Sequence, residues 1–419
     1  MRALAVLSMH TSPLAQAGTG DGGGMNVYVR ELSAALARRG VRCEIFTRTD
    51  DPSRPPTIGV EPNVRVHHVP AGPLAPVAKE QLPGLVDEWS DGVGARLAAL
   101  AVDGLGVDAI HAHYWLSGVA GHSLKHELDV PLISTFHTLD RVKAEASVEE
   151  LSASEPARRA LAEHAIIGCS DIVLASCSVE ADQLTELYGA DPDRLAIVAP
   201  GVDHAFFAPG EQSRARRAMG FDPDDPLILF VGRIQPLKGL TVAVDALAQV
   251  VARPGLERAT LAVVGGPSGP HGDDELAEVH RRVAAHGLGG RVRFMAPQPH
   301  HLLSTSLRAA DVAVVPSRSE SFGLVALEAA ACGVPVVAAA VGGLTTLVDH
   351  GRTGYLVEGR DPARFAAHLT DLLADRGGLR AAMGAEAAAR AARYTWSGAA
   401  AGLAARIDAL MSRELLLCR

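Results

Sequence analysis

Short apolar runs alternate with helix-like segments along the chain, and this alternation constrains the fold more than any other feature. Asn26–Arg39 has the spacing of an amphipathic helix and ends at Gly40. Apolar strands separated by helices are typical of a parallel sheet that is covered on both faces. The strands predicted in the first half are Ala3–Ser8, Cys43–Thr47, Val64–His68, Ala109–His113, Leu132–Phe136, Asp171–Ser176 and Leu195–Val198.

The pattern restarts after a stretch rich in proline and glycine, Pro200–Gly210. A chain of 419 residues is too long for one ordinary core. We therefore expect two Rossmann-like parallel-sheet domains, 1–203 and 204–393, followed by an alanine-rich helix in 394–419. Ligands of such sheets bind at the carboxyl ends of strands, so the site is expected in a cleft between the domains. The strands predicted in the second half are Leu227–Val231, Leu261–Val264, Val292–Phe294, Val312–Val315 and Val334–Ala338.

Composition excludes several classes of protein. A net charge of −9 and a pI of about 6.0 argue against a nucleic-acid partner and against a basic membrane-docking surface. The apolar run before His10 is too short for a signal peptide. No run of about 18 uncharged apolar residues follows it, so we expect no stable membrane insertion. The five cysteines lack CxxC spacing, which predicts free thiols and a cytoplasmic location.

A glycine-rich loop, Gly18–Gly24, lies between the first predicted strand and the first helix. Glycines let the backbone approach a ligand closely, and the start of a helix offers free N–H groups to an anion. A mobile loop is the simpler interpretation, and a dinucleotide fingerprint fits poorly. The loop is thus moderate evidence for phosphate binding.

Two cations follow the first strand of the second half, Arg233 and Lys238. An isolated pair of this kind is usually a feature of the surface. Here both side chains can reach one strand end, where two cations suit a diphosphate that gains charge as a bond to it breaks.

The most specific motif combines Glu320 and Glu328 with the segment Phe322-Gly323-Leu324 between them. The segment would form the first turn of a helix, whose exposed N–H groups suit phosphate or sugar oxygens. Capping by Ser319 or Ser321 would explain a polar start of the helix. It would not explain Glu328 inside an apolar helix, because an unpaired buried carboxylate is costly.

Together these motifs resemble the retaining GT-B glycosyltransferases, whose signature is a Glu, seven residues and a second Glu. The resemblance covers nearly the whole chain and implies a GT-B fold, with the last helix folded back onto the first domain. It implies that a UDP-sugar is the donor, with Glu320 on the sugar and Glu328 on the ribose. The implied donor-binding set is Gly23, Gly24, Arg233, Lys238, Glu320, Phe322, Gly323, Leu324 and Glu328.

Within that group the first half is similar to the D-inositol 3-phosphate glycosyltransferases. The similarity lies in Ser8–Pro13, the glycine-rich loop, Lys79–Pro83, His111–Gly118 and the segment Glu155–Arg159. It implies transfer of N-acetylglucosamine from UDP-GlcNAc to a phosphorylated polyol, 1D-myo-inositol 3-phosphate, in mycothiol biosynthesis. The implied acceptor-binding residues are His10, Asp21, Asn26, Lys79, Tyr114, Thr138 and Arg158.

The histidines need separate treatment. His111 and His113 alternate on one predicted strand and share a face, but no third ligand at a suitable spacing suggests a metal. We interpret both as structural or cleft-lining residues, and by the resemblance His137 meets a hydroxyl of the donor sugar. The pairs His67-His68 and His300-His301 are expected to be exposed and without function.

The expected mechanism is front-face substitution, in which the acceptor hydroxyl attacks from the side on which UDP leaves. Positive charge from Arg233, Lys238 and helix dipoles stabilises the departing diphosphate, so no cofactor is required. The resemblance allows a peripheral Mg²⁺, and we expect no metal ligands. Glu320 positions the donor and is not the base, and the implied catalytic set is His137, Arg233, Lys238 and Glu320.

Three alternatives stay open. A phosphatidylinositol mannosyltransferase shares the donor motif but would need a basic or amphipathic membrane face. A sucrose-phosphate-synthase-like enzyme also takes a phosphorylated acceptor. A non-catalytic sugar-nucleotide-binding protein is the third, against which the intact charged motif argues. The sequence leaves the oligomeric state open, a homodimer included.

Overall fold

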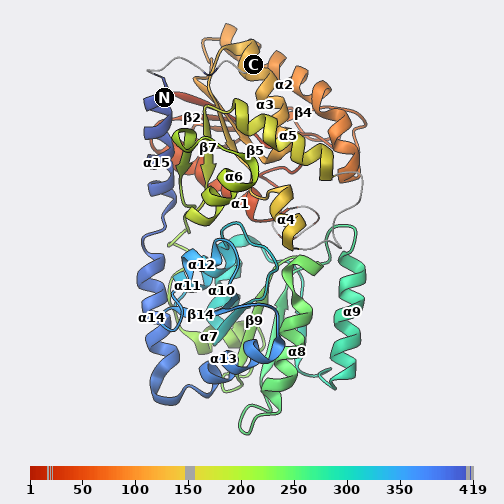
Figure 1. The fold of residues 1–419 in the computed structure, drawn as a ribbon, viewed down its shortest axis with the longest axis vertical. Coiled ribbons are helices and arrows are strands. Elements are labelled where there is room, and N and C mark those ends of the chain that lie inside the picture. The colour runs from red at the N-terminus through yellow and green to blue at the C-terminus, as the bar shows by residue number, and fades with distance from the viewer. Residues whose placement is uncertain (17, 19, 21, 147–155, 412–415, 417–419) are drawn as a thin grey trace. The chain divides into compact units, whose positions relative to one another are not determined.

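A computed structural model describes residues 1–16, 18, 20, 22–146, 156–411 and 416, and these residues form two compact units (Figure 1). Unit 1 consists of Met1–Ala15, Met25–Pro200 and Trp396–Arg419. Unit 2 consists of Gln16–Gly24 and Gly201–Thr395. The glycine-rich loop therefore groups with unit 2, although the sequence analysis had assigned it to the first domain.

Unit 1 is built on an eight-stranded sheet in the order β3-β4-β2-β1-β5-β6-β7-β8. All neighbouring strands are parallel except β3 and β4, which are antiparallel. The strands are β1 (Ala3–Leu7), β2 (Arg42–Arg48), β3 (Thr57–Glu61), β4 (Val64–Val69), β5 (Ala109–His113), β6 (Leu132–Thr135), β7 (Ile172–Ala175) and β8 (Leu195–Ile197).

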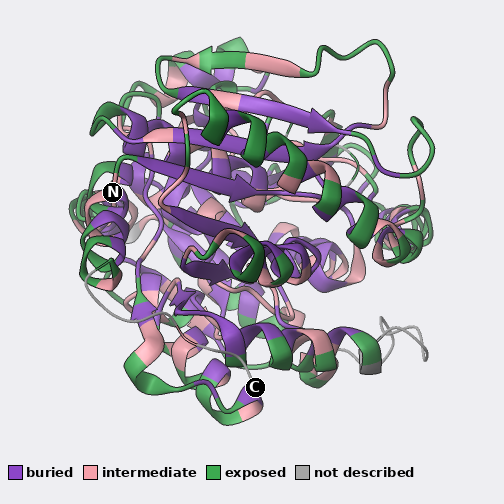
Figure 2. Cartoon of the chain, turned by 90° about the horizontal axis from the view of Figure 1, so that it is seen from above, coloured by how far each residue is buried: buried purple, intermediate pink, exposed green. Residues whose placement is uncertain are grey.

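The helices of unit 1 cover this sheet, and Figure 2 shows buried strands with exposed residues on the outer sides of helices. They are α1 (Gly24–Arg38), α2 (Val86–Val102), α3 (Tyr114–Leu128), α4 (Asp140–Ala146), α5 (Pro156–Cys169), α6 (Ser178–Tyr188) and α15 (Trp396–Leu410). The last of these packs beside α1, where the rings of Trp396 and Tyr28 meet edge-on at 5.6 Å. The amino group of Met1 also pairs with Asp408. The C-terminal helix thus lies in unit 1, as the resemblance implies.

Unit 2 is built on a six-stranded parallel sheet in the order β11-β10-β9-β12-β13-β14. Its strands are β9 (Leu227–Val231), β10 (Thr260–Val264), β11 (Val292–Met295), β12 (Val312–Val315), β13 (Val336–Ala339) and β14 (Gly354–Val357). Its helices are α7 (Gln212–Ala218), α8 (Leu240–Val251), α9 (Gly272–Ala285), α10 (His300–Ala309), α11 (Leu324–Ala331), α12 (Leu344–Leu347), α13 (Pro362–Ala374) and α14 (Leu379–Ala391). Two units built on mostly parallel sheets agree with the GT-B fold class that was predicted from the sequence.

Two expectations about the chain's chemistry need a comment. In the described part of the chain, no helix combines the length and the apolarity needed to cross a bilayer. Cys43, Cys177 and Cys332 are free and buried. Cys169 is disulfide-bonded, so the expectation of free thiols is wrong for this residue, and Cys418 lies outside the described residues.

The expectation that His67 and His68 are exposed is also wrong. Both lie on β4, next to the edge of the sheet, and both are buried. The His67 ring stacks on Phe46 at 4.8 Å, and its Nε2 is 2.7 Å from Oε2 of the fully buried Glu44. Arg65 also donates to this carboxylate, at 3.0 Å. Because strands of this sheet are covered on both faces, consecutive residues of β4 can both be buried.

We predict that Glu44→Gln destabilises the protein by about 3 kcal/mol, because breaking a buried, hydrogen-bonded ion pair leaves uncompensated charge. Burial alone would raise the pKa of Glu44, but the bonds from His67 and Arg65 outweigh it and lower that pKa from 4.5 to about 2. The carboxylate therefore stabilises the fold above pH 4.5 and loses this effect as the pH falls towards 2.

Urea unfolding at a series of pH values would measure the effect. The difference in unfolding free energy between the wild type and Glu44→Gln should shrink from pH 5 to pH 2. Glu61→Gln, at a half-exposed position of the neighbouring edge strand, is the control and should change stability little. Equal losses in the two variants would contradict the prediction.

Candidate functional site

Both sheets reverse their strand order beside their first strand. In unit 1, β1 has β2 on one side and β5 on the other; in unit 2, β9 has β10 on one side and β12 on the other. Loops after the two central strands of such a reversal diverge and leave a crevice for ligands. Most of the residues predicted from the sequence lie in the loops after β1, β5, β9 and β12 or in the helices that these loops lead into.

In unit 2 the loops after β9 and β12 bring Lys238 and Glu320 together. The Lys238 Nζ atom is 2.6 Å from Glu320 Oε2, and the Ser317 hydroxyl donates to the same oxygen at 3.3 Å. Both charged side chains are partly exposed, at 24% and 19%. A cation and a carboxylate predicted from separate motifs therefore meet at one point.

Backbone glycines make this meeting possible. A Cβ on Gly239, whose φ is +70°, would lie 2.2 Å from the Pro316 carbonyl oxygen. A Cβ on Gly342, whose φ is +48°, would lie 1.9 Å from the carbonyl oxygen of Glu320. Since real Cβ atoms do not approach backbone so closely, any larger residue would displace the loop that carries Glu320.

Helix α11 begins at the predicted turn. Its N-cap is Gly323, with a φ of +98°, and glycine has no side chain with which to cap the first turn. The N-cap position is therefore neither Ser319 nor Ser321. Phe322 and Gly323 are buried and Leu324 is half-buried. The N-terminus of such a helix suits an anion.

Glu328 lies in α11 and is 4% exposed. Its Oε1 is 2.6 Å from His300 Nε2, and the His300 ring lies 5.0 Å from Phe207. The expectation that His300 is exposed is wrong, whereas His301 is exposed. A buried carboxylate needs a partner, but only the fold shows that His300, the first residue of α10, is that partner.

The glycine-rich loop contacts the same unit. A Cβ on Gly23 would lie 3.8 Å from Arg233 Nε, and one on Gly24 would lie 3.3 Å from Leu324 Cδ1. The hydroxyl of Ser268 donates to the Gly20 carbonyl at 2.7 Å. Gly23 and Gly24 thus lie beside two of the residues predicted to bind the donor. Asp21 is outside the described residues.

In unit 1 three basic side chains surround the ring of Tyr114, which follows β5 and has a φ of +73°. The Lys79 Nζ atom lies 5.1 Å from the ring centroid, and the His10 ring lies 4.3 Å away. The guanidinium of Arg159 lies 4.9 Å from the same centroid. Positive φ is costly for a bulky residue and is concentrated at functional sites.

The arginine that contacts Thr138 and the Tyr114 ring is Arg159, whereas the resemblance implied its neighbour Arg158 for the acceptor phosphate, an assignment that stays a prediction. Arg159 is buried, and its Nη2 donates to the backbone oxygen of Thr138 at 2.7 Å and to its hydroxyl at 3.2 Å. Its Nε donates to Glu163 at 2.7 Å. Arg158 is exposed. Adjacent residues of a helix point about 100° apart, so only one of the two can face Thr138.

Asn26 and His137 hold their own loops. The Asn26 amide donates to the Thr11 hydroxyl at 2.7 Å and to the Ser12 carbonyl at 2.5 Å, which fixes the chain after β1. His137 follows β6 with a φ of +61°, and its Nε2 is 2.9 Å from His113 Nδ1. His111 and His113 are buried, in agreement with a structural interpretation.

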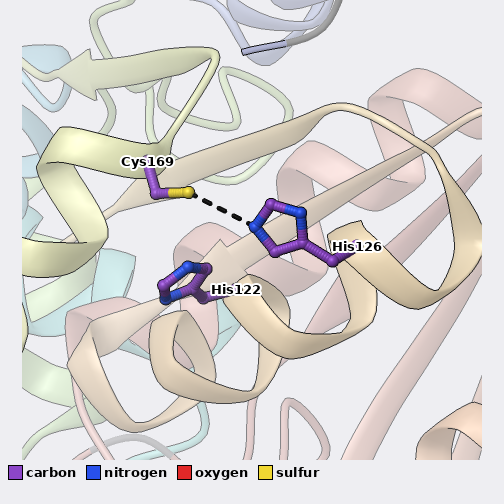
Figure 3. Close-up of side chains that lie close together, drawn as sticks. All are labelled: His122, His126 and Cys169. Carbon is purple, nitrogen blue, oxygen red and sulfur yellow. Dashed lines mark hydrogen bonds between the residues drawn. The ribbon is translucent and has the colours of Figure 1, made fainter. Parts of the chain in front are cut away.

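One group of described residues has potential metal-ligand atoms within 4.8 Å of one another: His122, His126 and Cys169 (Figure 3). The Sγ atom of Cys169 is 3.6 Å from His126 Nε2. Because Cys169 is disulfide-bonded, it has no thiolate to offer a metal. The group therefore supports no metal site in this state.

Comparisons with known proteins agree with this geometry. Residues 211–390 match the family "Glycosyl transferases group 1", and residues 23–201 match "Glycosyl transferase 4-like domain". D-inositol 3-phosphate glycosyltransferase 2 of Catenulispora acidiphila is 47% identical over 96% of this chain and 94% of its own. The enzyme of that name from Actinosynnema mirum is 47% identical over 94% of each. The chain belongs to the D-inositol 3-phosphate glycosyltransferase family.

Solved structures place this family among the GT-B glycosyltransferases. Sucrose-phosphate synthase from Thermosynechococcus elongatus is 32% identical and superposes with a TM-score of 0.88 over 98% of this chain and all of that one. Anabaena Alr3699/HepE in complex with UDP and glucose is 20% identical, with a TM-score of 0.75 over the same shares. The chain is thus a GT-B glycosyltransferase.

We predict that His300→Ala destabilises the protein by about 1–3 kcal/mol, because it leaves the buried Glu328 carboxylate without this hydrogen-bond donor. Thermal and urea unfolding would measure the loss. His301→Ala, at the exposed neighbouring position of α10, should stay within about 0.5 kcal/mol of the wild type. If both variants unfold like the wild type, the His300–Glu328 bond contributes nothing to stability.

Proposed function

We propose that the protein transfers N-acetylglucosamine from UDP-GlcNAc to 1D-myo-inositol 3-phosphate, with retention of anomeric configuration, as a step of mycothiol biosynthesis. The observation that carries the proposal is the cluster of Lys79, Tyr114, Thr138 and Arg159 in unit 1. Two cations and two hydroxyls can cage a phosphate dianion. Relatives that are 47% identical carry the name of this acceptor.

The donor would bind to unit 2. Arg233, Lys238 and the first amides of α11 supply positive charge and N–H groups for the diphosphate, and Glu328 can accept hydrogen bonds from the ribose hydroxyls. Lys238 has three donor hydrogens. It can therefore keep its bond to Glu320 while it contacts the diphosphate, and so hold the carboxylate for the sugar.

The reaction would be a front-face substitution. The attacking inositol oxygen forms a bond to the anomeric carbon as the bond between that carbon and the phosphate oxygen breaks, and UDP leaves on the same side. The proton of the attacking hydroxyl passes to the departing phosphate oxygen. Arg233 and Lys238 stabilise the charge that develops there, so the mechanism uses no metal and no protein nucleophile.

A second candidate deserves a direct test, because the likeness to sucrose-phosphate synthase extends over the whole chain. UDP release from UDP-GlcNAc and from UDP-glucose would be measured with inositol 3-phosphate, unphosphorylated myo-inositol, fructose 6-phosphate or no acceptor. The proposal expects release from UDP-GlcNAc that depends on inositol 3-phosphate. Release that depends on fructose 6-phosphate instead, or no release with any acceptor, would refute it.

The two adjacent arginines give a matched test of the acceptor site. Arg159→Lys should raise the KM for inositol 3-phosphate about tenfold or more, because an ammonium cannot reproduce the planar guanidinium that reaches Thr138. Arg158→Lys should leave the KM unchanged. Thermal unfolding of both variants would exclude loss of the fold through Glu163. An equal effect of the two substitutions would contradict the placement of Arg159.

The donor site has its own prediction. Lys238→Ala and Glu320→Gln should each lower kcat by about 100-fold, the usual cost of removing one group that stabilises or positions the reacting charge. Steady-state kinetics and calorimetric titration with UDP would measure turnover and donor affinity separately. Wild-type turnover with unchanged UDP affinity in either variant would contradict the assignment of that residue to the donor site.

A further inference from the structure

Unit 1 contains a cluster of three histidines, of which His111 and His113 are buried and His137 is partly buried. His111 and His113 alternate on β5 and so point to the same face of the sheet, with ring centroids 4.0 Å apart. His137, after the neighbouring strand β6, lies at the end of the cluster. Its ring is nearly parallel to that of His113 at 5.1 Å, and the edge of Tyr28 meets it at 5.0 Å. Packing on several sides therefore leaves the His137 ring little freedom.

The two β5 histidines have different hydrogen-bond partners. His113 Nδ1 is 2.9 Å from His137 Nε2, so these two rings are directly bonded. His111 Nε2 is instead 2.8 Å from the hydroxyl of Thr135. The two histidines share a strand, a face and complete burial, but only His113 is bonded to His137.

All three rings are neutral near pH 7. Burial lowers the pKa of His111 and of His137 to about 3. Burial, together with repulsion from His111 and His137, holds the pKa of His113 well below its usual value. A neutral imidazole carries one N–H and one lone pair. Only one proton can therefore occupy the bond between His113 and His137.

That single proton couples the two tautomers. If His113 donates from Nδ1, the proton of His137 must sit on its own Nδ1, which then offers an N–H. If His137 donates from Nε2, its Nδ1 is a bare lone pair that accepts. The far nitrogen of His137 thus changes from donor to acceptor according to the state of His113.

The backbone adds a second reason for a fixed His137. Its φ of +61° is an unfavourable region for histidine, and such residues persist only where their surroundings over-determine them. A bond from the rigid central strand β5 to the ring is one such constraint. It holds both the strained backbone and the direction of the imidazole.

We propose that His113 is a positioning residue for His137, whose tautomer and ring orientation it fixes through the Nδ1–Nε2 bond. His113 would thereby set whether His137 gives or accepts a hydrogen bond at the donor-sugar hydroxyl. The kinetic consequence rests on the proposed function, in which His137 meets that hydroxyl. The tautomer coupling itself does not depend on the substrate.

The first experiment is therefore free of substrate. Long-range ¹H–¹⁵N correlation spectra of histidine-labelled protein report the tautomer of each imidazole, and His137→Gln assigns the signals of His137. The wild type should show a single neutral tautomer of His137. His113→Leu should give a mixture or the other tautomer, whereas His111→Leu should leave the pattern unchanged. An unchanged single tautomer in His113→Leu, or a mixture in the wild type, overturns the proposal.

Kinetics test the consequence. His113→Leu should lower kcat for N-acetylglucosamine transfer about tenfold or more, with an unchanged KM for inositol 3-phosphate. His113→Asn, whose amide can donate and accept near the position of Nδ1, should recover most of this loss. His111→Leu should retain more activity than His113→Leu, since it removes an equally buried histidine that is not bonded to His137.

The outcomes of the two experiments are distinguishable. A wild-type protein that fails to transfer the sugar would contradict the proposed function, and the spectra would still decide the coupling of His113 to His137. A lower kcat in both leucine variants, without rescue by asparagine, would mean that the cluster acts only as packing and would overturn the positioning role. Thermal unfolding of each variant shows that the comparison is made between folded proteins.

Discussion

Parallel strands impose one constraint on which the rest of this structure depends: all their carboxyl ends lie at the same edge of the sheet. In each unit the strand order also reverses beside the first strand, so the loops after β1 and β5, and after β9 and β12, leave the sheet in different directions. Chemistry-bearing residues far apart in the sequence meet there for topological reasons. Lys238 and Glu320, which are 82 positions apart, are bonded at 2.6 Å.

Glycine then determines how close these loops come. Gly239 brings the loop after β9 against Pro316, and Gly342 brings the loop before α12 against Glu320. Neither contact adds charge or a hydrogen-bonding side chain, yet both fix the backbone from which Lys238 and Glu320 extend. Because the reacting groups of a transferase must be held precisely, these glycines belong to the proposed donor site as much as its charged residues do.

Much of the fold could be predicted because most strands of both sheets are short runs rich in apolar residues and are separated by helices. The features that were not predicted, two strands and a buried histidine pair, have physical causes. β3 is a partly exposed edge strand, Thr57–Glu61, that is interrupted by a glycine, and β14 is a short run, Gly354–Val357, that begins with a glycine. His67 and His68 look like a polar surface pair, but β4 is covered on both faces and Glu44 requires partners. In these cases the local sequence resembles a loop, and tertiary contacts decide the outcome.

The candidate site was predictable by residue type more than by direction. The Glu-x₇-Glu spacing predicted Glu320 and Glu328. A buried carboxylate needs a partner, but to identify that partner as His300 one must know which helix lies beside α11. The choice between Arg158 and Arg159 depends on the phase of one helix. A local signal existed, since Glu163 follows Arg159 by four residues, the spacing of an ion pair along a helix.

The electrostatics of the two units suggest a division of labour. Unit 2 presents charged groups, Arg233, Lys238 and Glu320, at a partly exposed edge, where they can act on a diphosphate. The histidine cluster of unit 1 is neutral: with a pKa of about 3, His137 would hold a proton only in strong acid. A base of that strength cannot take the proton of an inositol hydroxyl at neutral pH. In the proposed reaction the departing phosphate is the better proton acceptor, which agrees with a histidine that only directs a hydrogen bond.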